Sequence, residues 1–274
     1  MTQASRIAAV FSQRKQQGQL AFMPFLAAGD PDVATTGRVI RELAAAGADL
    51  IEVGFPYSDP IADGPVIQSS YTRALSKRLK LKDIFDCIAG VSGQVGCPLV
   101  AMVSYAIIFR TGTDSFVKQA REAGFSGLIV PDLPGDEAAE FAALVARQGM
   151  DLIQLVAPTT PADRAARILQ NATGFVYCIA VAGTTGAREI LAPQLADMLK
   201  SLRSQTSLPL AVGFGISRPE QVEQLRGLAD GVIVGSAIVR HLEALSVDPS
   251  KTDDVMRQLV EYASSIARAA HATR

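Results

Sequence analysis

Eight short apolar runs, separated by stretches with helical spacing, constrain the fold of this chain more strongly than any other feature. Each run is too short for a helix and lacks the apolar–polar alternation of a half-exposed strand, which is typical of strands buried on both faces of a parallel sheet. The runs cover residues 20–27, 49–54, 98–104, 127–132, 152–157, 174–181, 209–215 and 231–235.

Between these runs, apolar residues recur at the three- and four-residue spacing of amphipathic helices. Local signals agree: Asp114 and Asp136 lie near expected helix N-termini, and Gly47 and Gly124 lie just past expected C-termini. The expected helices cover residues 6–17, 33–46, 66–76, 82–91, 113–123, 136–148, 161–171, 189–204, 218–228, 236–245 and 252–270.

Eight βα units in an unbroken series predict an α/β fold, a single (β/α)8 TIM barrel with an extra N-terminal helix. The length of 274 residues is normal for such a barrel, which typically has about 250. No linker divides the chain, so we expect one domain over residues 1–274. A doubly wound open sheet is the alternative, but that fold does not need eight units so evenly spaced.

Composition excludes several classes of function. The 26 basic and 27 acidic residues give a net charge of −1 without a basic stripe, so we expect neither nucleic acid nor an anionic membrane as a partner. Three cysteines without CxxC spacing indicate neither a disulfide framework nor a metal site. The first 19 residues are polar, and no apolar run reaches the roughly 18 residues of a membrane span. We therefore expect a soluble, cytoplasmic protein.

The segment 51–65 carries the residues that most strongly indicate catalysis. Glu52 lies inside an apolar run, and a buried acid costs several kcal/mol unless a partner or a task compensates. The loop that follows contains three prolines together with Asp59 and Asp63. In a barrel the loops after the strands carry the chemistry, so Glu52 and Asp63 can face one pocket. The structural alternative is an ion-paired strand residue followed by ordinary turn-forming aspartates.

Glycines mark the ends of the last two expected strands. Residues 213–217 read Gly-Phe-Gly-Ile-Ser, and residues 235–238 read Gly-Ser-Ala-Ile. Backbone N–H groups can approach an anion closely at glycine, and a helix that begins at Ser236 would direct its positive end to the same point. The loops after strands seven and eight often bind phosphate in such barrels. A Gly-Thr-Thr-Gly segment at 183–186 can close over that anion, although all these glycines can also serve tight turns alone.

The residue types that are missing from the strands narrow the chemistry. Both histidines, His241 and His271, follow the eighth run, and no lysine lies within an apolar run. A histidine base, a histidine metal ligand and a Schiff-base lysine are therefore all disfavoured. Acid–base catalysis by carboxylates on a phosphorylated substrate is the reaction type that these residues favour.

These motifs resemble the tryptophan synthase α chain family over nearly the whole length. The similarity begins at Phe-Leu-Ala-Ala-Gly-Asp-Pro (25–31) and includes the loop Pro-Tyr-Ser-Asp-Pro-Ile-Ala-Asp-Gly-Pro (56–65), Pro-Asp-Leu-Pro (131–134) and Gly-Phe-Gly-Ile-Ser (213–217). The resemblance implies cleavage of indole-3-glycerol phosphate to indole and glyceraldehyde 3-phosphate in tryptophan biosynthesis, without a cofactor or metal. It also implies a pyridoxal-phosphate β chain as partner, in an α2β2 assembly.

The reaction needs proton exchange at the indole ring and at a hydroxyl group of the side chain. We expect Glu52, in an apolar strand, to have a raised pKa and to exchange those protons, and Asp63, on a solvated loop, to stay ionised and accept from the indole N–H. By resemblance, the indole slot consists of Phe25, Ile67, Met102, Ile129 and Tyr177. The implied phosphate site consists of Gly186, Gly213, Phe214, Gly215, Gly235 and Ser236. Asp59, Thr185 and Arg188 would couple loop closure to the β chain.

The chain departs from the family pattern at a few positions. Ser104 and Ala106 follow the third run where the family commonly has Tyr and Asn, Ala180 stands where Ser is usual, and Thr184 replaces the usual Val. The third-strand loop contributes to partner contact in the family, so a stand-alone lyase that releases free indole is one alternative. A non-catalytic phosphosugar-binding barrel is another, but it gives no reason for Glu52 in an apolar strand.

Overall fold

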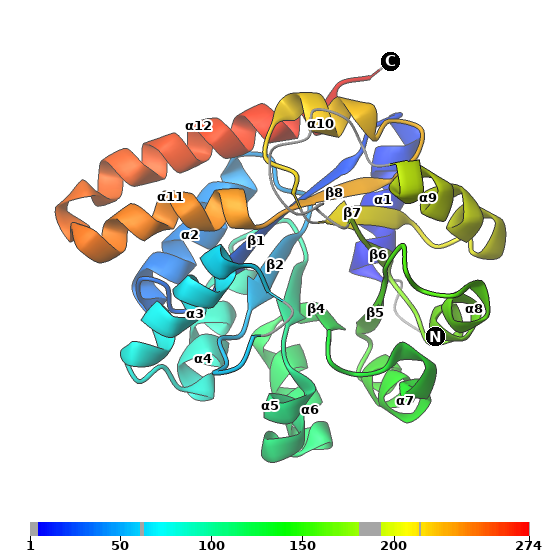
Figure 1. Cartoon of the computed structure of the whole chain (residues 1–274). Helices are drawn as coiled ribbons and strands as arrows, with labels where there is room; N and C mark the ends of the chain where they lie inside the picture. The colour runs from blue at the N-terminus through cyan, green and yellow to red at the C-terminus, as the bar shows by residue number, and fades with distance from the viewer. Residues whose placement is uncertain (1–4, 61–62, 181–192, 214, 274) are drawn as a thin grey trace.

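In the computed structural model, which describes residues 5–60, 63–180, 193–213 and 215–273, eight parallel strands close into a barrel in the order of the sequence (Figure 1). This confirms the predicted TIM barrel and excludes the open sheet. The strands are β1 Ala21–Ala27, β2 Ile51–Gly54, β3 Leu99–Met102, β4 Phe125–Ile129, β5 Asp151–Val156, β6 Val176–Ile179, β7 Leu210–Gly213 and β8 Gly231–Val234.

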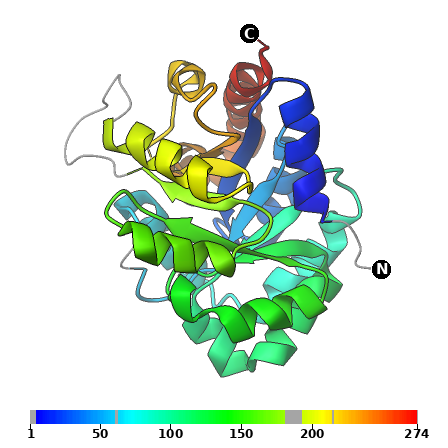
Figure 2. The same cartoon turned by 90° about the vertical axis from the view of Figure 1, so that its right-hand side faces the viewer.

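Helices surround the barrel on all sides (Figures 1 and 2). They are α1 Arg6–Gln16, α2 Val33–Ala45, α3 Pro65–Ser76, α4 Leu81–Ser92, α5 Tyr105–Thr111, α6 Thr113–Ala123, α7 Ala139–Arg147, α8 Ala162–Gln170, α9 Pro193–Gln205, α10 Pro219–Gln224, α11 Ser236–Val247 and α12 Thr252–His271. No helix in the described part of the chain combines the length and the apolar character that a membrane crossing requires.

The extra N-terminal helix is confirmed, and it closes one end of the barrel. Ile7 and Phe11 of α1 are buried among the side chains that fill the barrel interior. The ring of Phe11 lies 5.4 Å from that of Phe175, which directly precedes β6. Since α1 covers the amino-terminal ends of the strands, the site has to form at their carboxyl ends.

Strand β2 shows how the sequence divides its side chains between two cores. Ile51 and Val53 belong to the large cluster between the barrel and the helices, whereas Leu50 belongs to the cluster inside the barrel. Because successive strand residues point to opposite faces, Glu52 and Gly54 face the interior with Leu50. The strand therefore directs the carboxyl group of Glu52 into the apolar interior of the barrel.

Several boundaries differ from the sequence predictions by a few residues, and one helix is additional. Helix α5 was not expected, strand β4 begins at Phe125 instead of residue 127, and α10 ends at Gln224 instead of residue 228. The chain turns tightly after α10, with Gly227 at φ +76°, so the helix cannot continue. The helix expected from residue 136 begins instead as a 3-10 turn, Gly135–Glu137, and α7 starts at Ala139.

Candidate active site

Glu52 is a buried carboxyl group without a hydrogen-bond partner in the described part of the chain. Its side chain is 0% exposed, and neither carboxylate oxygen has a hydrogen-bond partner among the described residues. Removal from water disfavours the charged form. Burial therefore raises the pKa of Glu52 from 4.5 to about 8, as the apolar strand predicted, and the carboxyl group is mostly protonated at neutral pH.

Asp63 lies on the loop between β2 and α3, directly before the glycine that precedes the helix. It is half-buried, and burial raises its pKa from 3.8 to about 6. The expectation of a well-solvated Asp63 was therefore wrong, because the residue is half-buried beside α3, where Gln68 binds its backbone carbonyl. With a pKa of about 6 the group is still ionised by about ten to one at pH 7.

Two tyrosines lie within the electrostatic field of both carboxyl groups. Burial raises the pKa of Tyr71, and the charges of Asp63, Tyr57 and Glu52 raise it further. Burial also raises the pKa of Tyr177, followed by the charges of Glu52 and Asp63. Glu52 and Asp63 come from different elements, yet both act on the same two tyrosines.

The five predicted indole-slot residues lie in two apolar clusters that meet at Met102. Phe25 and Ile67 form one cluster with Tyr71, and Met102 packs against it. The other cluster fills the barrel interior and contains Ile129 and Tyr177, and Met102 packs against this one too. Phe25 is also the register partner of Glu52 on the neighbouring strand. The structure thus gathers these residues around Glu52, while their role in binding stays a prediction.

Sequence reasoning missed two aromatic residues of this region. Tyr71 is 2% exposed, and its ring lies 5.7 Å from that of Tyr57, which packs against the same cluster as Phe25. Tyr71 follows Ile67 by four residues on α3, so both side chains lie on one face of the helix. That spacing was a visible signal for Tyr71, whereas the position of Tyr57 depends on how its loop folds back.

Two strand-end glycines provide space for the aromatic rings. A Cβ atom on Gly54 would lie 2.5 Å from Cζ of Phe25 and 2.6 Å from the Tyr71 hydroxyl oxygen. A Cβ atom on Gly213 would overlap the hydroxyl group of Tyr177. Gly213, which was predicted only as a phosphate ligand, therefore has a packing role as well.

The predicted phosphate site is described in part. Gly235 directly precedes α11, whose first residue is Ser236, and a Cβ atom on Gly235 would meet nothing closer than Phe25 at 3.8 Å. Gly215 has φ +83°, a conformation that favours glycine. These residues lie at the carboxyl ends of β7 and β8, where the N-terminus of a twelve-residue helix can attract an anion. The remaining predicted residues Gly186, Phe214, Thr185 and Arg188 lie outside the described residues.

Asp59 lines a cavity that borders the Phe25 cluster through Tyr57. A cavity of about 690 Å³ is lined by Tyr57, Asp59, Ser104 and Asp132, among others. The Asp59 carboxylate accepts a hydrogen bond of 2.9 Å from the Ser58 hydroxyl. The role of Asp59 in coupling to a partner stays a prediction.

The departure at Ser104 has a structural explanation. The Ser104 hydroxyl donates to Oδ2 of Asp132 at 2.6 Å, and its oxygen accepts from the backbone N–H of Ala106 at 3.3 Å. Asp132 also accepts from the Tyr105 N–H at 2.7 Å. Ser104 is therefore the N-cap of the unexpected helix α5, a position that serine favours.

Possible metal ligands do not gather in the described part of the chain. No group of three or more His, Cys, Asp or Glu side chains there is arranged to hold a metal ion. The three cysteines are free thiols.

Comparison with known proteins gives consistent results. Residues 11–271 match the family described as Tryptophan synthase alpha chain. A protein of that name from Synechococcus sp. (strain CC9902) is 45% identical over 246 residues, which cover 89% of this chain and 91% of the relative. Another from Rhodopirellula baltica is 47% identical over 253 residues, with coverage of 89% and 91%.

Solved structures agree in fold as well as in sequence. A chain of Mycobacterium tuberculosis tryptophan synthase superposes with a TM-score of 0.88 at 32% identity, covering 98% of this chain and 100% of that one. The tryptophan synthase subunit alpha of Legionella pneumophila gives a TM-score of 0.88 at 32% identity, with coverage of 97% and 98%.

Proposed function

Since the chain belongs to the tryptophan synthase alpha chain family, we propose that Glu52 and Asp63 are the acid–base pair of its reaction. Membership makes the chain a carbon–carbon lyase of tryptophan biosynthesis, which cleaves indole-3-glycerol phosphate to indole and glyceraldehyde 3-phosphate. The observation that carries the assignment is the buried, unpartnered carboxyl group of Glu52, because a structural role does not explain its cost.

The two carboxyl groups are suited to different steps. Protonated Glu52 donates its proton to the ring carbon that bears the glycerol side chain, while ionised Asp63 accepts a hydrogen bond from the indole N–H as the ring gains positive charge. The carbon–carbon bond then breaks, and its electrons return to the ring. The Glu52 carboxylate takes the proton of the adjacent side-chain hydroxyl as that carbon becomes an aldehyde. Glu52 ends protonated, so the cycle closes without a cofactor.

The remaining predicted residues supply binding. The indole ring is held beside Glu52 by Phe25, Ile67, Met102, Ile129 and Tyr177. This assignment is supported by the two apolar clusters that meet at Met102. Backbone N–H groups of Gly213, Gly215, Gly235 and Ser236 bind the phosphate in this proposal. It is supported by Gly235 and Ser236 at the N-terminus of α11 and by Gly213 at the end of β7. Gly186 and Phe214 complete the phosphate site in this proposal.

As an alpha chain, the protein works with a tryptophan synthase beta chain. We infer an α2β2 assembly, in which Asp59 responds to a cation of the β chain and favours closure of the loop that carries Asp63. Thr185 and Arg188 complete the lid over the substrate in this scheme. A cytoplasmic location is part of the same proposal, supported by the three free thiols.

An assay of indole formation from indole-3-glycerol phosphate, with and without a cognate β chain, tests the proposal. Glu52→Gln keeps the shape of the side chain and should lose about 10²–10⁴-fold in kcat, since acid–base catalysis typically supplies that much. A Glu52→Gln chain with most of its kcat would remove Glu52 from the mechanism. If the wild type forms no indole either with or without the β chain, the result would favour a non-catalytic phosphosugar-binding barrel.

Partner dependence separates the α subunit from a stand-alone lyase. If docking favours the closed loop by about 1.4–2.8 kcal/mol, the rate should rise about 10- to 100-fold on titration with the β chain. Asp59→Ala should reduce that stimulation and leave the partner-free rate unchanged. Full activity without a β chain would favour the stand-alone lyase.

A further inference from the structure

Gln68, on the first turns of α3, binds the turn that carries Asp63. Its side-chain amide nitrogen donates to the backbone carbonyl of Asp63 at 2.7 Å and to that of Pro60 at 3.2 Å. The Asp63 N–H in turn donates to the Pro60 carbonyl at 3.1 Å. One exposed amide group therefore joins both ends of the turn, so the position of the Asp63 main chain depends on where α3 holds Gln68.

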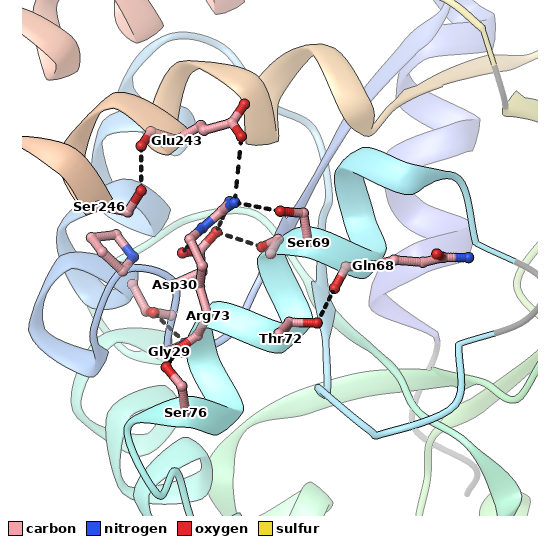
Figure 3. A network of polar contacts seen from close by, with 12 residues as sticks. Gly29, Asp30, Gln68, Ser69, Thr72, Arg73, Ser76, Glu243 and Ser246 are labelled. Atoms are coloured by element: carbon pink, nitrogen blue, oxygen red, sulfur yellow. Dashed lines mark hydrogen bonds and ion pairs between the residues drawn. The ribbon is translucent and has the colours of Figure 1, made fainter.

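Helix α3 is itself anchored by a polar network (Figure 3). Asp30, which follows β1 and is 1% exposed, accepts from Nε of Arg73 at 3.0 Å and from Nη2 at 2.7 Å. The Ser70 hydroxyl donates to the same carboxylate at 2.5 Å. Nη1 of Arg73 also lies 3.6 Å from a carboxylate oxygen of Glu243 on α11. The network thus fixes α3 against the end of β1 and against α11.

The buried face of α3, which includes Ser70 of this network, also carries part of the apolar slot. Ile67 and Tyr71 are buried against Phe25, while Gln68 is exposed. A rotation or slide of α3 would therefore displace the slot and the Asp63 turn together. Because the network prevents such movement, Gln68 can transfer the position of the helix to the turn.

We propose that Gln68 is a positioning residue, whose two hydrogen bonds hold the Asp63 carboxylate in its half-buried place. The inference rests on the proposed function, because it assumes that Asp63 acts in the reaction. Gln68 does not contact the reacting atoms in this scheme. Without its amide, both carbonyl groups can bind water and the turn can move outward, so the reaction loses the geometry on which positioned groups depend.

The test compares four variants of the full chain, each assayed for indole formation with a saturating cognate β chain. Gln68→Met removes the donor and keeps the length of the side chain, and Gln68→Glu keeps the shape but places a carboxylate against two carbonyls. Both should lower kcat by about 10- to 100-fold. Gln68→Lys keeps a donor and should recover most of the rate. Gln94→Met is the matched control, because the exposed Gln94 side chain likewise donates to a backbone carbonyl, that of Gly90 at 2.7 Å, near the end of α4.

Three readouts distinguish positioning from general stability. The melting temperature should change little for Gln68→Met, since the side chain is exposed. In the Asp63→Asn background, Gln68→Met should add almost no further loss of kcat, because a residue that acts through Asp63 has nothing left to position. Hydrogen exchange at the Asp63 amide should be faster in Gln68→Met than in the wild type.

The outcomes separate this inference from the proposed function. If Asp63→Asn lowers kcat and the Met and Glu variants at Gln68 do not, the positioning role is wrong and the role of Asp63 stands. If Asp63→Asn leaves kcat unchanged, the proposed function of Asp63 fails first. A full additional loss from Gln68→Met in the Asp63→Asn background would also contradict the proposal, as would unfolding of both the Met and Glu variants.

Discussion

Replacement of Glu52 by Gln should lower the activity of the protein and, between pH 5 and pH 8, raise its stability above that of the wild type. In the folded chain the carboxyl group has a pKa of about 8, against an ordinary value of 4.5. As pH rises above 4.5, the unfolded chain releases this proton while the folded chain retains it. Glu52 therefore lowers the free energy of unfolding progressively between pH 4.5 and about 8.

The magnitude follows from that interval. The slope is about 1.4 kcal/mol per pH unit and falls off near each pKa, so the wild type should lose about 3.5 kcal/mol relative to Glu52→Gln between pH 5 and pH 8. The glutamine amide resembles the protonated carboxyl group in shape and carries no charge at any pH, so the variant escapes this loss. Below pH 4.5 the two proteins should have nearly equal stability, because both carry a neutral group at this position.

Urea unfolding at pH 5, 6, 7 and 8, followed by circular dichroism, measures the difference. Glu140→Gln is a suitable control, since it removes an exposed carboxyl group from α7 and should leave the pH dependence of stability parallel to that of the wild type. A constant difference between Glu52→Gln and the wild type from pH 5 to pH 8 would refute the reasoning. That result would mean that Glu52 is solvated or paired in solution.

Three further outcomes test the surroundings of the site. Gly213→Ala should lower both stability and kcat, because its Cβ overlaps the Tyr177 hydroxyl. Gly235→Ala has space for its Cβ in the free chain and should raise only KM. Unfolding curves and steady-state kinetics of the two variants test this difference. Inorganic phosphate should compete with substrate in the wild type and less in Gly235→Ala, and the absence of competition in the wild type would place the anion elsewhere. Arg73→Met leaves the buried Asp30 carboxylate without its cation and should cost about 2–4 kcal/mol in urea unfolding, while a loss below about 0.5 kcal/mol would show that the network does not anchor α3.

The barrel was predictable because its strands are buried on both faces. Each apolar run stands out between polar turns, and the structure places all eight within a few residues of their expected limits. Helix α5 was not predictable in the same way. Its first turn depends on Ser104, whose hydroxyl is held by Asp132 from the end of the next strand, and a contact between residues 28 positions apart leaves no local pattern.

The part of the site that could be predicted is the residue whose polarity differs from that of its neighbours in the sequence. Glu52 is a carboxylate in an apolar run, and its raised pKa follows from that alone. The half-burial of Asp63 could not be inferred, because it depends on the way the loop folds against α3 and on the two carbonyls that Gln68 holds. Tyr71 could have been predicted from the sequence, since it follows Ile67 by four residues and so lies on the same face of the helix.

The pairing of a protonated Glu52 with an ionised Asp63 is tested most directly by the pH dependence of kcat/KM for indole-3-glycerol phosphate cleavage in the wild type and in Asp63→Asn. The wild type should give a bell, falling below about pH 6 as Asp63 gains a proton and above about pH 8 as Glu52 loses one. In Asp63→Asn the rate should be lower and the acid limb should move or disappear, while the basic limb stays near pH 8. Substrate ionisation affects both proteins equally, so an acid limb unchanged by Asp63→Asn, or a wild-type rate that does not fall above pH 8, would contradict the assignment of the two carboxyl groups.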